Sequence, residues 1–243
     1  MKVLTACCLF SLCLLFSFKE PRISDGRTLL KNPLLGAWLS EKAQQQHLLL
    51  FTNRHYSYTV YDKTGKKFYH TEGGTYQFDG TKLSTRLEFN SSDPKGMGKE
   101  SLLNAQVAAK QLQLNWPVEG TNWKRIDEAG GPLNATWRIT GREQQGTMNT
   151  IQPSARKTIK LLTAKRFQWA AINTATGEFF GTGGGTYTFK DGVYTEHIDF
   201  FSRDSSRVGM SLSFEGQVQE ANWHHRGKSS KGDPIYEIWS KED

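Results

Sequence analysis

Two copies of one pattern follow each other along the chain, and this duplication constrains the fold more than any other feature. Residues 51–107 align without a gap with residues 162–218. The identical pairs include Thr52 with Thr163, Phe68 with Phe179, Thr71 with Thr182, Gly73 with Gly184, Gly74 with Gly185, Thr75 with Thr186, Tyr76 with Tyr187, Phe78 with Phe189 and Phe89 with Phe200. A period of about 100 residues suits a whole domain better than a solenoid repeat. We therefore expect two domains of one fold.

Tryptophans begin and end each copy and help to place the domain boundaries. The matched segments are Gly36-Ala37-Trp38 with Ala135-Thr136-Trp137, Asn115-Trp116 with Asn222-Trp223, and Trp123 with Trp239. The second copy carries an insertion of about a dozen residues near 141–157. We predict a first domain over 33–127, a linker containing Gly and Pro over 128–132, and a second domain over 133–241.

Apolar side chains alternate with period two in both copies, which indicates strands. One face carries Tyr56, Tyr58 and Val60 in the first copy and Phe167, Trp169 and Ala171 in the second. The same alternation predicts inward-facing Leu87 with Phe89, and Ile198 with Phe200, beside outward-facing Glu88 and Asp199. No stretch has a sustained helical period. The expected fold class is all-β: two tandem antiparallel up-and-down β-barrels of about eight strands each, because closure removes exposed strand edges.

The first 18 residues predict a signal peptide, followed by an N-terminal lead over 19–32. Lys2 precedes the uncharged run Val3–Phe18, which is shorter than the roughly 20 apolar residues that cross a bilayer. All three cysteines lie in this run, so the mature chain would have no disulfide, thiolate metal site or thiol nucleophile. We expect a secreted or periplasmic protein without an integral membrane segment, and lipoprotein anchoring stays open.

The basic residues do not predict nucleic-acid binding, despite a formal net charge of +7. Positions 31–128 hold 13 basic and 10 acidic residues, and positions 129–243 hold 14 basic and 12 acidic residues, so the excess is spread over both copies. One cluster has no interspersed acid and consists of Arg156, Lys157, Lys160, Lys165 and Arg166. We interpret that cluster as a solvated strand edge.

Several motifs resemble the lipocalin and calycin families. These are the first-strand Gly36-Ala37-Trp38 and a basic residue after the last-strand tryptophan, in Trp123-Lys124-Arg125 and Trp239-Ser240-Lys241. The Gly-Thr-Tyr, Tyr194-Thr195-Glu196 and Pro234–Trp239 elements are similar to small secreted bacterial lipocalin-like domains of uncharacterised function. The resemblance spans residues 33–241 and implies that Trp38 and Trp137 each close a barrel end, with Trp123, Arg125 and Trp239 as further structural residues. The second copy has Ala135 in place of the glycine, and the first lacks the Tyr-x-Glu element.

Aromatic residues and one carboxylate on the predicted inner faces are the candidate ligand-binding residues. They are Tyr56, Tyr58, Tyr76, Phe167, Trp169, Tyr187 and Glu196. The aromatic residues either line a cavity or form a packed core. Glu196 either orients a ligand or pairs with an internal Lys or Arg.

Other candidate chemistry is weaker. His197, His224, His225 and Glu196 have metal-ligand chemistry, but adjacent strand residues face opposite sides, and we favour exposed turn histidines and no metal site. The Gly181–Gly185 run precedes a strand rather than a helix, which argues against a phosphate-binding loop.

The function that these observations favour is binding of a small apolar or amphipathic molecule, without catalysis and without a cofactor. Two alternatives remain. One is a surface interaction module with solid barrels, and the other is an enzyme centred on Glu196 with Tyr194 or His197. The oligomeric state is left open.

Overall fold

The structure is a computed structural model that describes residues 32–117 and 122–242. The predicted signal peptide and residues 19–31 of the predicted lead lie outside the described residues. Residues 32–243 belong to one compact unit, which contains both copies of the duplicated pattern. None of the helices in the described part of the chain is long and apolar enough to cross a membrane.

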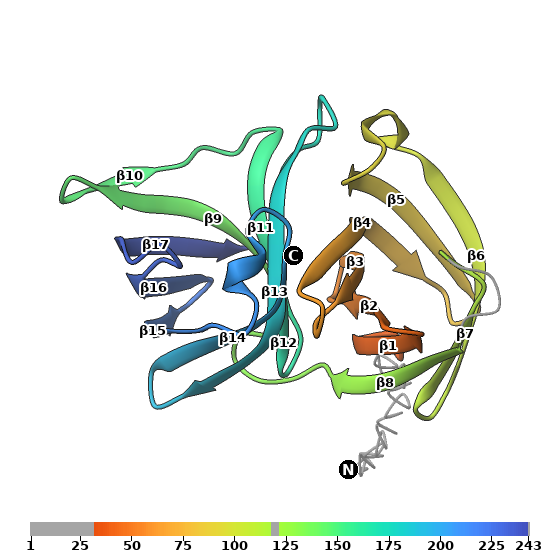
Figure 1. Cartoon of the computed structure of the whole chain (residues 1–243). Coiled ribbons are helices and arrows are strands. Elements are labelled where there is room, and N and C mark those ends of the chain that lie inside the picture. The colour runs from red at the N-terminus through yellow and green to blue at the C-terminus, as the bar shows by residue number, and fades with distance from the viewer. Residues whose placement is uncertain (1–31, 118–121, 243) are drawn as a thin grey trace, which may run out of the picture. The chain divides into compact units, whose positions relative to one another are not determined.

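The first copy forms barrel 1 (Figure 1). Its strands are β1 (Gly36–Lys42), β2 (Gln45–Phe51), β3 (His55–Asp62), β4 (Lys67–Phe78), β5 (Lys82–Asn90), β6 (Glu100–Ala108), β7 (Gln111–Leu114) and β8 (Asn122–Glu128). A short 3₁₀ turn, η1 (Pro94–Gly96), connects β5 to β6.

The second copy forms barrel 2 and carries one additional strand. Its strands are β9 (Ala135–Gln144), β10 (Thr147–Thr150), β11 (Arg156–Leu162), β12 (Arg166–Asn173), β13 (Phe179–Lys190), β14 (Val193–Phe201), β15 (Ser211–Gln219), β16 (Asn222–Lys228) and β17 (Pro234–Lys241). The turn η2 (Ser205–Arg207) connects β14 to β15 as η1 connects β5 to β6.

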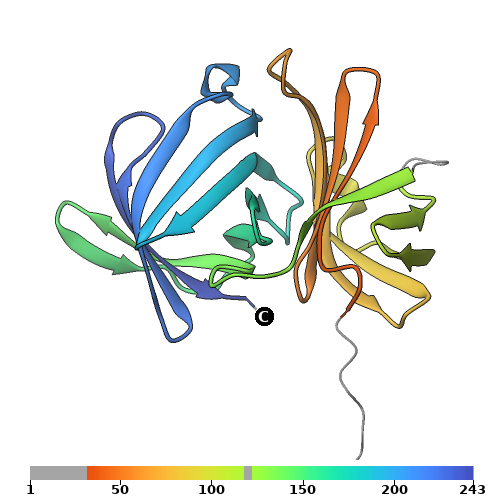
Figure 2. The ribbon, with the colours of Figure 1, turned by 90° about the horizontal axis from the view of Figure 1, so that it is seen from below.

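Both sheets are antiparallel meanders that close on themselves. β1 pairs with β8 in barrel 1, and β9 pairs with β17 in barrel 2. The prediction of two tandem eight-stranded up-and-down barrels is confirmed. Among the described strands, β10 pairs with β9 alone, and it lies in the insertion of the second copy; Figures 1 and 2 show this hairpin projecting beyond the neighbouring strands.

A β-bulge interrupts each barrel at the glycine pair that the two copies share. The register between β4 and β5, and between β13 and β14, shifts between the two glycines. Glu88 and Asp199 are the extra residues, so the side chains that follow them change face. Phe89 and Phe200 therefore lie in a cluster shared by both barrels, where the Tyr61 and Phe200 rings are 4.8 Å apart. The prediction that Phe89 and Phe200 point inward is wrong, because simple alternation does not account for a bulge.

This shared cluster is separate from the two barrel interiors. Its buried members are Ala37, Leu48, Leu50, Tyr61, Phe89, Ile159, Leu161, Ala170, Ile172 and Phe200. Each strand that contributes to it has one apolar face inside its own barrel and a second apolar face that packs against the neighbouring barrel. Every residue of β3 is buried for this reason. We call this cluster the inter-barrel cluster.

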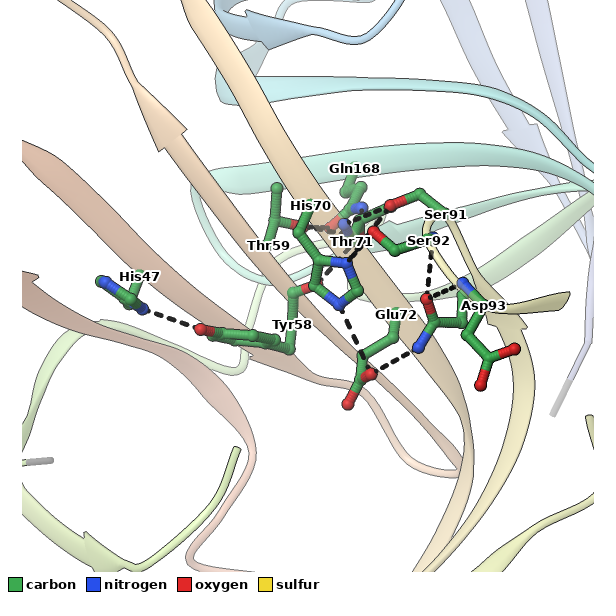
Figure 3. A network of polar contacts seen from close by, with 11 residues as sticks. His47, Tyr58, Thr59, His70, Thr71, Glu72, Ser91, Ser92, Asp93 and Gln168 are labelled. Carbon is green, nitrogen blue, oxygen red and sulfur yellow. Dashed lines mark hydrogen bonds and ion pairs between the residues drawn. The ribbon is translucent and has the colours of Figure 1, made fainter. Parts of the chain in front are cut away.

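One buried glutamine of barrel 2 forms hydrogen bonds with threonines of barrel 1 (Figure 3). The Gln168 Oε1 atom accepts from Thr59 Oγ1 at 2.9 Å. Its Nε2 atom donates to Thr71 Oγ1 at 2.9 Å and to Thr182 Oγ1 of its own barrel at 3.1 Å. Both polar atoms of this amide thus have partners, as burial requires.

Candidate functional site

A fully buried tryptophan stands near the start of each barrel. The indole Nε1 atoms of Trp38 and Trp137 donate to the carbonyl oxygens of Leu34 and Leu133, each at 2.8 Å. The Arg125 guanidinium lies 4.0 Å from the centre of the Trp38 ring and donates to backbone carbonyls of the chain that enters barrel 1. These contacts hold the entering chain against the end of the barrel.

Barrel 2 has a lysine where barrel 1 has Arg125. The Nζ atom of Lys241 is 5.6 Å from the centre of the Trp137 ring. The last strands also bury Trp123 and Trp239 in their barrels. Trp239 Nε1 donates to Glu237 Oε2 at 3.1 Å, whereas Trp123 Nε1 has no hydrogen-bond partner among the described residues.

The side chains predicted to meet a ligand are divided between the two interiors. Tyr56, Tyr58 and Tyr76 belong to the core of barrel 1, and Phe167, Trp169, Tyr187 and Glu196 lie in barrel 2. In each copy, the hydroxyl of one of these tyrosines donates a hydrogen bond to a backbone carbonyl. Tyr76 donates to the Thr52 carbonyl and Tyr187 donates to the Thr163 carbonyl, both at 2.7 Å.

A buried ion pair lies inside barrel 2. Lys160 Nζ is 2.9 Å from Glu196 Oε1, and the two side chains are 5% and 7% exposed. The Tyr194 hydroxyl donates to the same carboxylate oxygen at 3.0 Å. Four aromatic rings have their centres 4.9 to 5.9 Å from Lys160 Nζ, namely Phe167, Tyr194, Trp223 and Trp239. Their π faces add to the stabilisation of this buried cation.

Barrel 1 has neutral residues at all of these positions. The aligned pairs are Lys160 with Leu49, Tyr194 with Leu83, Glu196 with Thr85 and, on continuing the same shift, His225 with Leu114. Strand pairing agrees, because Leu49 and Lys160 each pair with the buried tryptophan at the start of their copy. A barrel of this topology therefore forms without the ion pair.

A second buried carboxylate, that of Glu237, lies close to this ion pair and is itself paired with a half-exposed arginine. Glu237 Oε1 accepts from Arg142 Nη2 at 2.6 Å, and the Arg142 side chain is half exposed. The Nδ1 atom of His225 is 3.6 Å from Glu237 Oε2. Neither ring nitrogen of the buried His225 has a hydrogen-bond partner in the described part of the chain.

Burial and charge set the ionisation of this group. Burial lowers the pKa of His225 despite the opposing carboxylates, so the ring is neutral at pH 7. Burial alone would raise the pKa of Glu237, but the close contact with the His225 ring and the positive charges of Arg142 and Lys160 outweigh burial and lower it to about 2. Glu237 is therefore ionised at neutral pH.

A cavity of about 340 Å³ lies where β9 leaves β11 and turns to pair with β10. Its cationic lining residues are Arg138, Arg142, Arg156 and Lys157. Its apolar lining residues are Ile139, Ile151, Ala171 and Phe180. Ser154 and Thr158 also line it, and among the described residues the lining contains no carboxylate. We call it the lateral cavity; the insertion of the second copy supplies several of its walls.

Two of the four cationic groups of the lateral cavity are incompletely paired, whereas Lys157 forms ion pairs with Glu88 at 3.2 Å and Glu242 at 3.1 Å, and Arg142 with Glu237. Arg138 Nη1 is 3.8 Å from Glu242, while its buried Nε and Nη2 atoms have no hydrogen-bond partner among the described residues. The Arg156 guanidinium lies 4.6 Å from the centre of the Phe180 ring and forms no ion pair within the described residues. A buried donor without a partner is costly, so an anion at this place would be stabilised.

Most members of the basic cluster do not form the solvated strand edge that the sequence predicted. Lys160 is buried in the barrel interior, and Arg156 and Lys157 line the lateral cavity. Arg166 forms an ion pair with buried Asp199 at 2.9 Å. The sequence does contain a signal that Lys160 points into the barrel. Lys160 and the inward-facing Leu162 are two residues apart on one strand, so both lie on the same face.

The two adjacent histidines also depart from the prediction of exposed turn residues. His225 is buried inside barrel 2, and His224 is partly buried with Nδ1 2.9 Å from the Tyr236 hydroxyl. The matching of Trp116 with Trp223 is wrong as well, because Trp223 on β16 pairs with Val218 on β15. Strand pairing gives Leu112 as the barrel 1 counterpart of Trp223.

The structure does not bring the histidines together as metal ligands. His197 is exposed, and its Nδ1 atom is 2.7 Å from the Ser211 hydroxyl. Within residues 32–117 and 122–242, no three His, Cys, Asp or Glu side chains are grouped as a metal ion requires.

The fold defines the class of this protein: a tandem pair of closed, eight-stranded antiparallel barrels, consistent with a calycin-like fold. No protein-family model and no curated protein matches the chain. One fold can host many functions, so the chemistry of the site decides what this protein does.

Proposed function

We propose that the protein is an exported, non-enzymatic binding protein of lipocalin-like type, and that barrel 2 binds a small amphipathic anion in the lateral cavity. The observation that carries this proposal is the lining of that cavity: among the described residues it combines apolar side chains with two incompletely paired arginines, Arg138 and Arg156. Ligand sites are usually apolar with a few well-placed polar groups. The cationic groups favour an anionic head, and the apolar wall favours a hydrocarbon tail.

Arg138 and Arg156 are the residues that we assign to the anionic head. Arg138 has two buried guanidinium nitrogens without a hydrogen-bond partner among the described residues, and Arg156 has no carboxylate partner there. Arginine presents parallel donors that fit a carboxylate or phosphate. Arg142 is already bound to Glu237, so its contribution is smaller.

The apolar part of the ligand is limited by the size of the cavity. A volume of about 340 Å³ is at the lower end of the range of roughly 300–1,000 Å³ for ligand pockets. Ile139 and Ile151 lie against the core of barrel 2, so a tail entering beside them extends the existing apolar surface. We therefore expect a short amphiphile rather than a long lipid.

Calorimetric titration of the mature chain with octanoate and with octan-1-ol tests the proposal. These probes share a tail length and differ in charge. We expect octanoate to bind at least about tenfold more tightly, because a charge-assisted hydrogen bond contributes about 1.5–3 kcal/mol. Equal binding of the two, or no binding of octanoate, would contradict an anion site.

Two matched variants locate the site. Arg156→Gln removes a cation that lines the cavity, and Lys190→Gln removes an exposed cation of the same barrel that does not line it. Octanoate binding should weaken about tenfold only in Arg156→Gln, with unchanged melting temperatures in both. An equal effect of both variants would mean that octanoate responds to net charge alone.

A further inference from the structure

Barrel 1 contains a carboxylate that has no lysine or arginine partner among the described residues. Glu72 on β4 pairs with Tyr58 on β3, so both side chains point into the barrel (Figure 3). Glu72 Oε2 accepts from Asn90 Nδ2 at 2.9 Å and is 3.4 Å from His70 Nε2. Its side chain is only 15% exposed, and within the described residues its ion-pair partner is His70. Removing most of a carboxylate from water is costly unless a cation compensates it.

Aromatic rings surround the same place. The Trp116 ring centre is 5.5 Å from that of Tyr56 and 6.2 Å from that of Tyr58. The His70 ring centre is 6.0 Å from that of Tyr58. Burial, and then the charge of Glu72, raise the pKa of Tyr56 and of Tyr58, which agrees with a carboxylate close to both rings.

A second histidine, His47, contacts Tyr58 and supplies no positive charge to this place. His47 Nδ1 is 2.7 Å from the Tyr58 hydroxyl, and burial followed by the charge of Lys42 lowers the pKa of His47. His47 is therefore neutral at pH 7. Lys42 is exposed at the end of β1 and forms no ion pair with Glu72.

The fold does not require an acidic residue at this position. The counterpart of Glu72 in barrel 2 is Gly183, and the counterpart of His70 is Gly181. A Cβ atom on Gly183 would be 2.8 Å from the Trp169 indole nitrogen, so barrel 2 fills the place with an aromatic ring. Glu72 is thus specific to barrel 1, and closure of a barrel of this topology does not depend on it.

We propose that Glu72, Tyr56, Tyr58 and Trp116 form a second binding site, which takes a small organic cation such as a quaternary ammonium group. The carboxylate supplies the opposite charge, and the π faces of Tyr and Trp attract a desolvated cation. His70 lies beside both and would orient the carboxylate. This goes beyond the anion-binding function, because the site lies in the other barrel and selects the opposite charge.

Tetramethylammonium is the probe for this site, and the indole N–H signals of ¹⁵N-labelled mature protein are the readout. The chain has 7 tryptophans, and substitution of each by Phe assigns its signal. We expect saturable shifts at Trp116 and Trp123, the two whose rings contact Tyr58, and none at Trp137 or Trp239 of barrel 2. Sodium chloride at the same concentration should shift none of them.

Glu72→Gln tests the countercharge, and Glu215→Gln is the matched control. The glutamine amide oxygen in Glu72→Gln still accepts a hydrogen bond from Asn90, so this variant removes the charge without leaving that donor unpaired. The control residue Glu215 is exposed and lies in barrel 2. Tetramethylammonium affinity should fall at least about tenfold in Glu72→Gln and stay unchanged in Glu215→Gln, with equal melting temperatures.

Three results would overturn the cation site. They are equal shifts with sodium and tetramethylammonium, shifts spread over the tryptophans of both barrels, and full affinity in Glu72→Gln. Octanoate is titrated into the same samples to test the anion site separately from the cation site. Loss of the octanoate response with retained tetramethylammonium binding would reject only the anion site, and the reverse result would reject only the cation site.

Discussion

At the scale of single residues, the Lys160–Glu196 ion pair is the least expected feature of barrel 2. Removing two charges from water costs several kcal/mol per ion, and a well-packed apolar pair of similar volume is often equally or more stable. Barrel 1 contains an uncharged alternative, with Leu49 and Thr85 at these positions. The ion pair is therefore specific to barrel 2, where the charge of Lys160 also helps to keep Glu237 ionised.

Substituting one member of this pair should destabilise the protein more than substituting both. Lys160→Met leaves the Glu196 carboxylate buried without its cation, which should lower the free energy of unfolding by about 3–5 kcal/mol. The double variant Lys160→Leu with Glu196→Thr copies barrel 1 and should recover most of that loss. Urea unfolding of the parent and both variants measures this. A double variant less stable than Lys160→Met would contradict the reasoning.

His55 should make the protein less stable in acid. Burial, and then the charge of Lys157, lower the pKa of His55 from 6.5 to about 4. Between these two values the unfolded chain binds a proton and the folded chain does not, so stability is lost as pH falls from 6.5 towards 4. The loss is on the order of 3 kcal/mol.

The variant His55→Gln isolates this contribution, because glutamine does not titrate. Urea unfolding at pH 7 and at pH 4 should show a smaller acid loss in His55→Gln than in the parent. The two proteins should differ little in slope above pH 7, where the histidine is neutral in both states. Parallel pH profiles throughout would exclude His55 as a source of acid sensitivity.

At the scale of strands, alternation predicted the inward faces of β3 and β12 but not those of residues that follow a bulge. Tyr56 and Phe167 point inward as their strands alternate, whereas Phe89 does not. The lateral cavity could not be predicted from the sequence for a related reason. It depends on where β9 changes its partner from β11 to β10, and pairing between strands is not encoded in the period of one strand.

The bulge itself should tolerate no side chain at its second glycine. A Cβ atom on Gly74 would overlap the carbonyl oxygen of Arg86 and lie 2.7 Å from the Glu88 nitrogen, and neither backbone atom moves easily. Gly74→Ala should therefore lower the free energy of unfolding by about 1–3 kcal/mol. Gly130→Ala is the control, because its Cβ would have its nearest neighbour 4.0 Å away. Thermal unfolding that ranks the two variants equally would contradict this account.

At the scale of the whole molecule, the contact between the barrels uses equivalent surfaces of the two copies. Phe68 and Phe179 are aligned with each other, and their rings stack with centres 6.5 Å apart and planes 7° apart. Leu50 and Leu161 are likewise aligned, and both are buried in the inter-barrel cluster. Contacts of this kind are those of a two-fold dimer interface. The pattern is what fusion of two copies of a self-associating barrel would produce.

Such an interface should couple the two barrels during unfolding. The inter-barrel cluster buries side chains of both barrels, so neither barrel loses its fold without exposing apolar surface of the other. We expect the parent protein to unfold in one calorimetric transition. Leu161→Lys places an unpaired charge in this cluster, which costs several kcal/mol, and should separate the unfolding into two transitions.

Val193→Lys is the matched control for this uncoupling, since Val193 is 46% exposed and lies outside the cluster. It should leave the single transition in place. Leu161 is on β11, next to Lys160 but on the opposite face. Octanoate binding to Leu161→Lys therefore also shows whether the lateral cavity depends on the contact between the barrels. A single, unshifted transition in Leu161→Lys would mean that the barrels are held together by contacts other than this cluster.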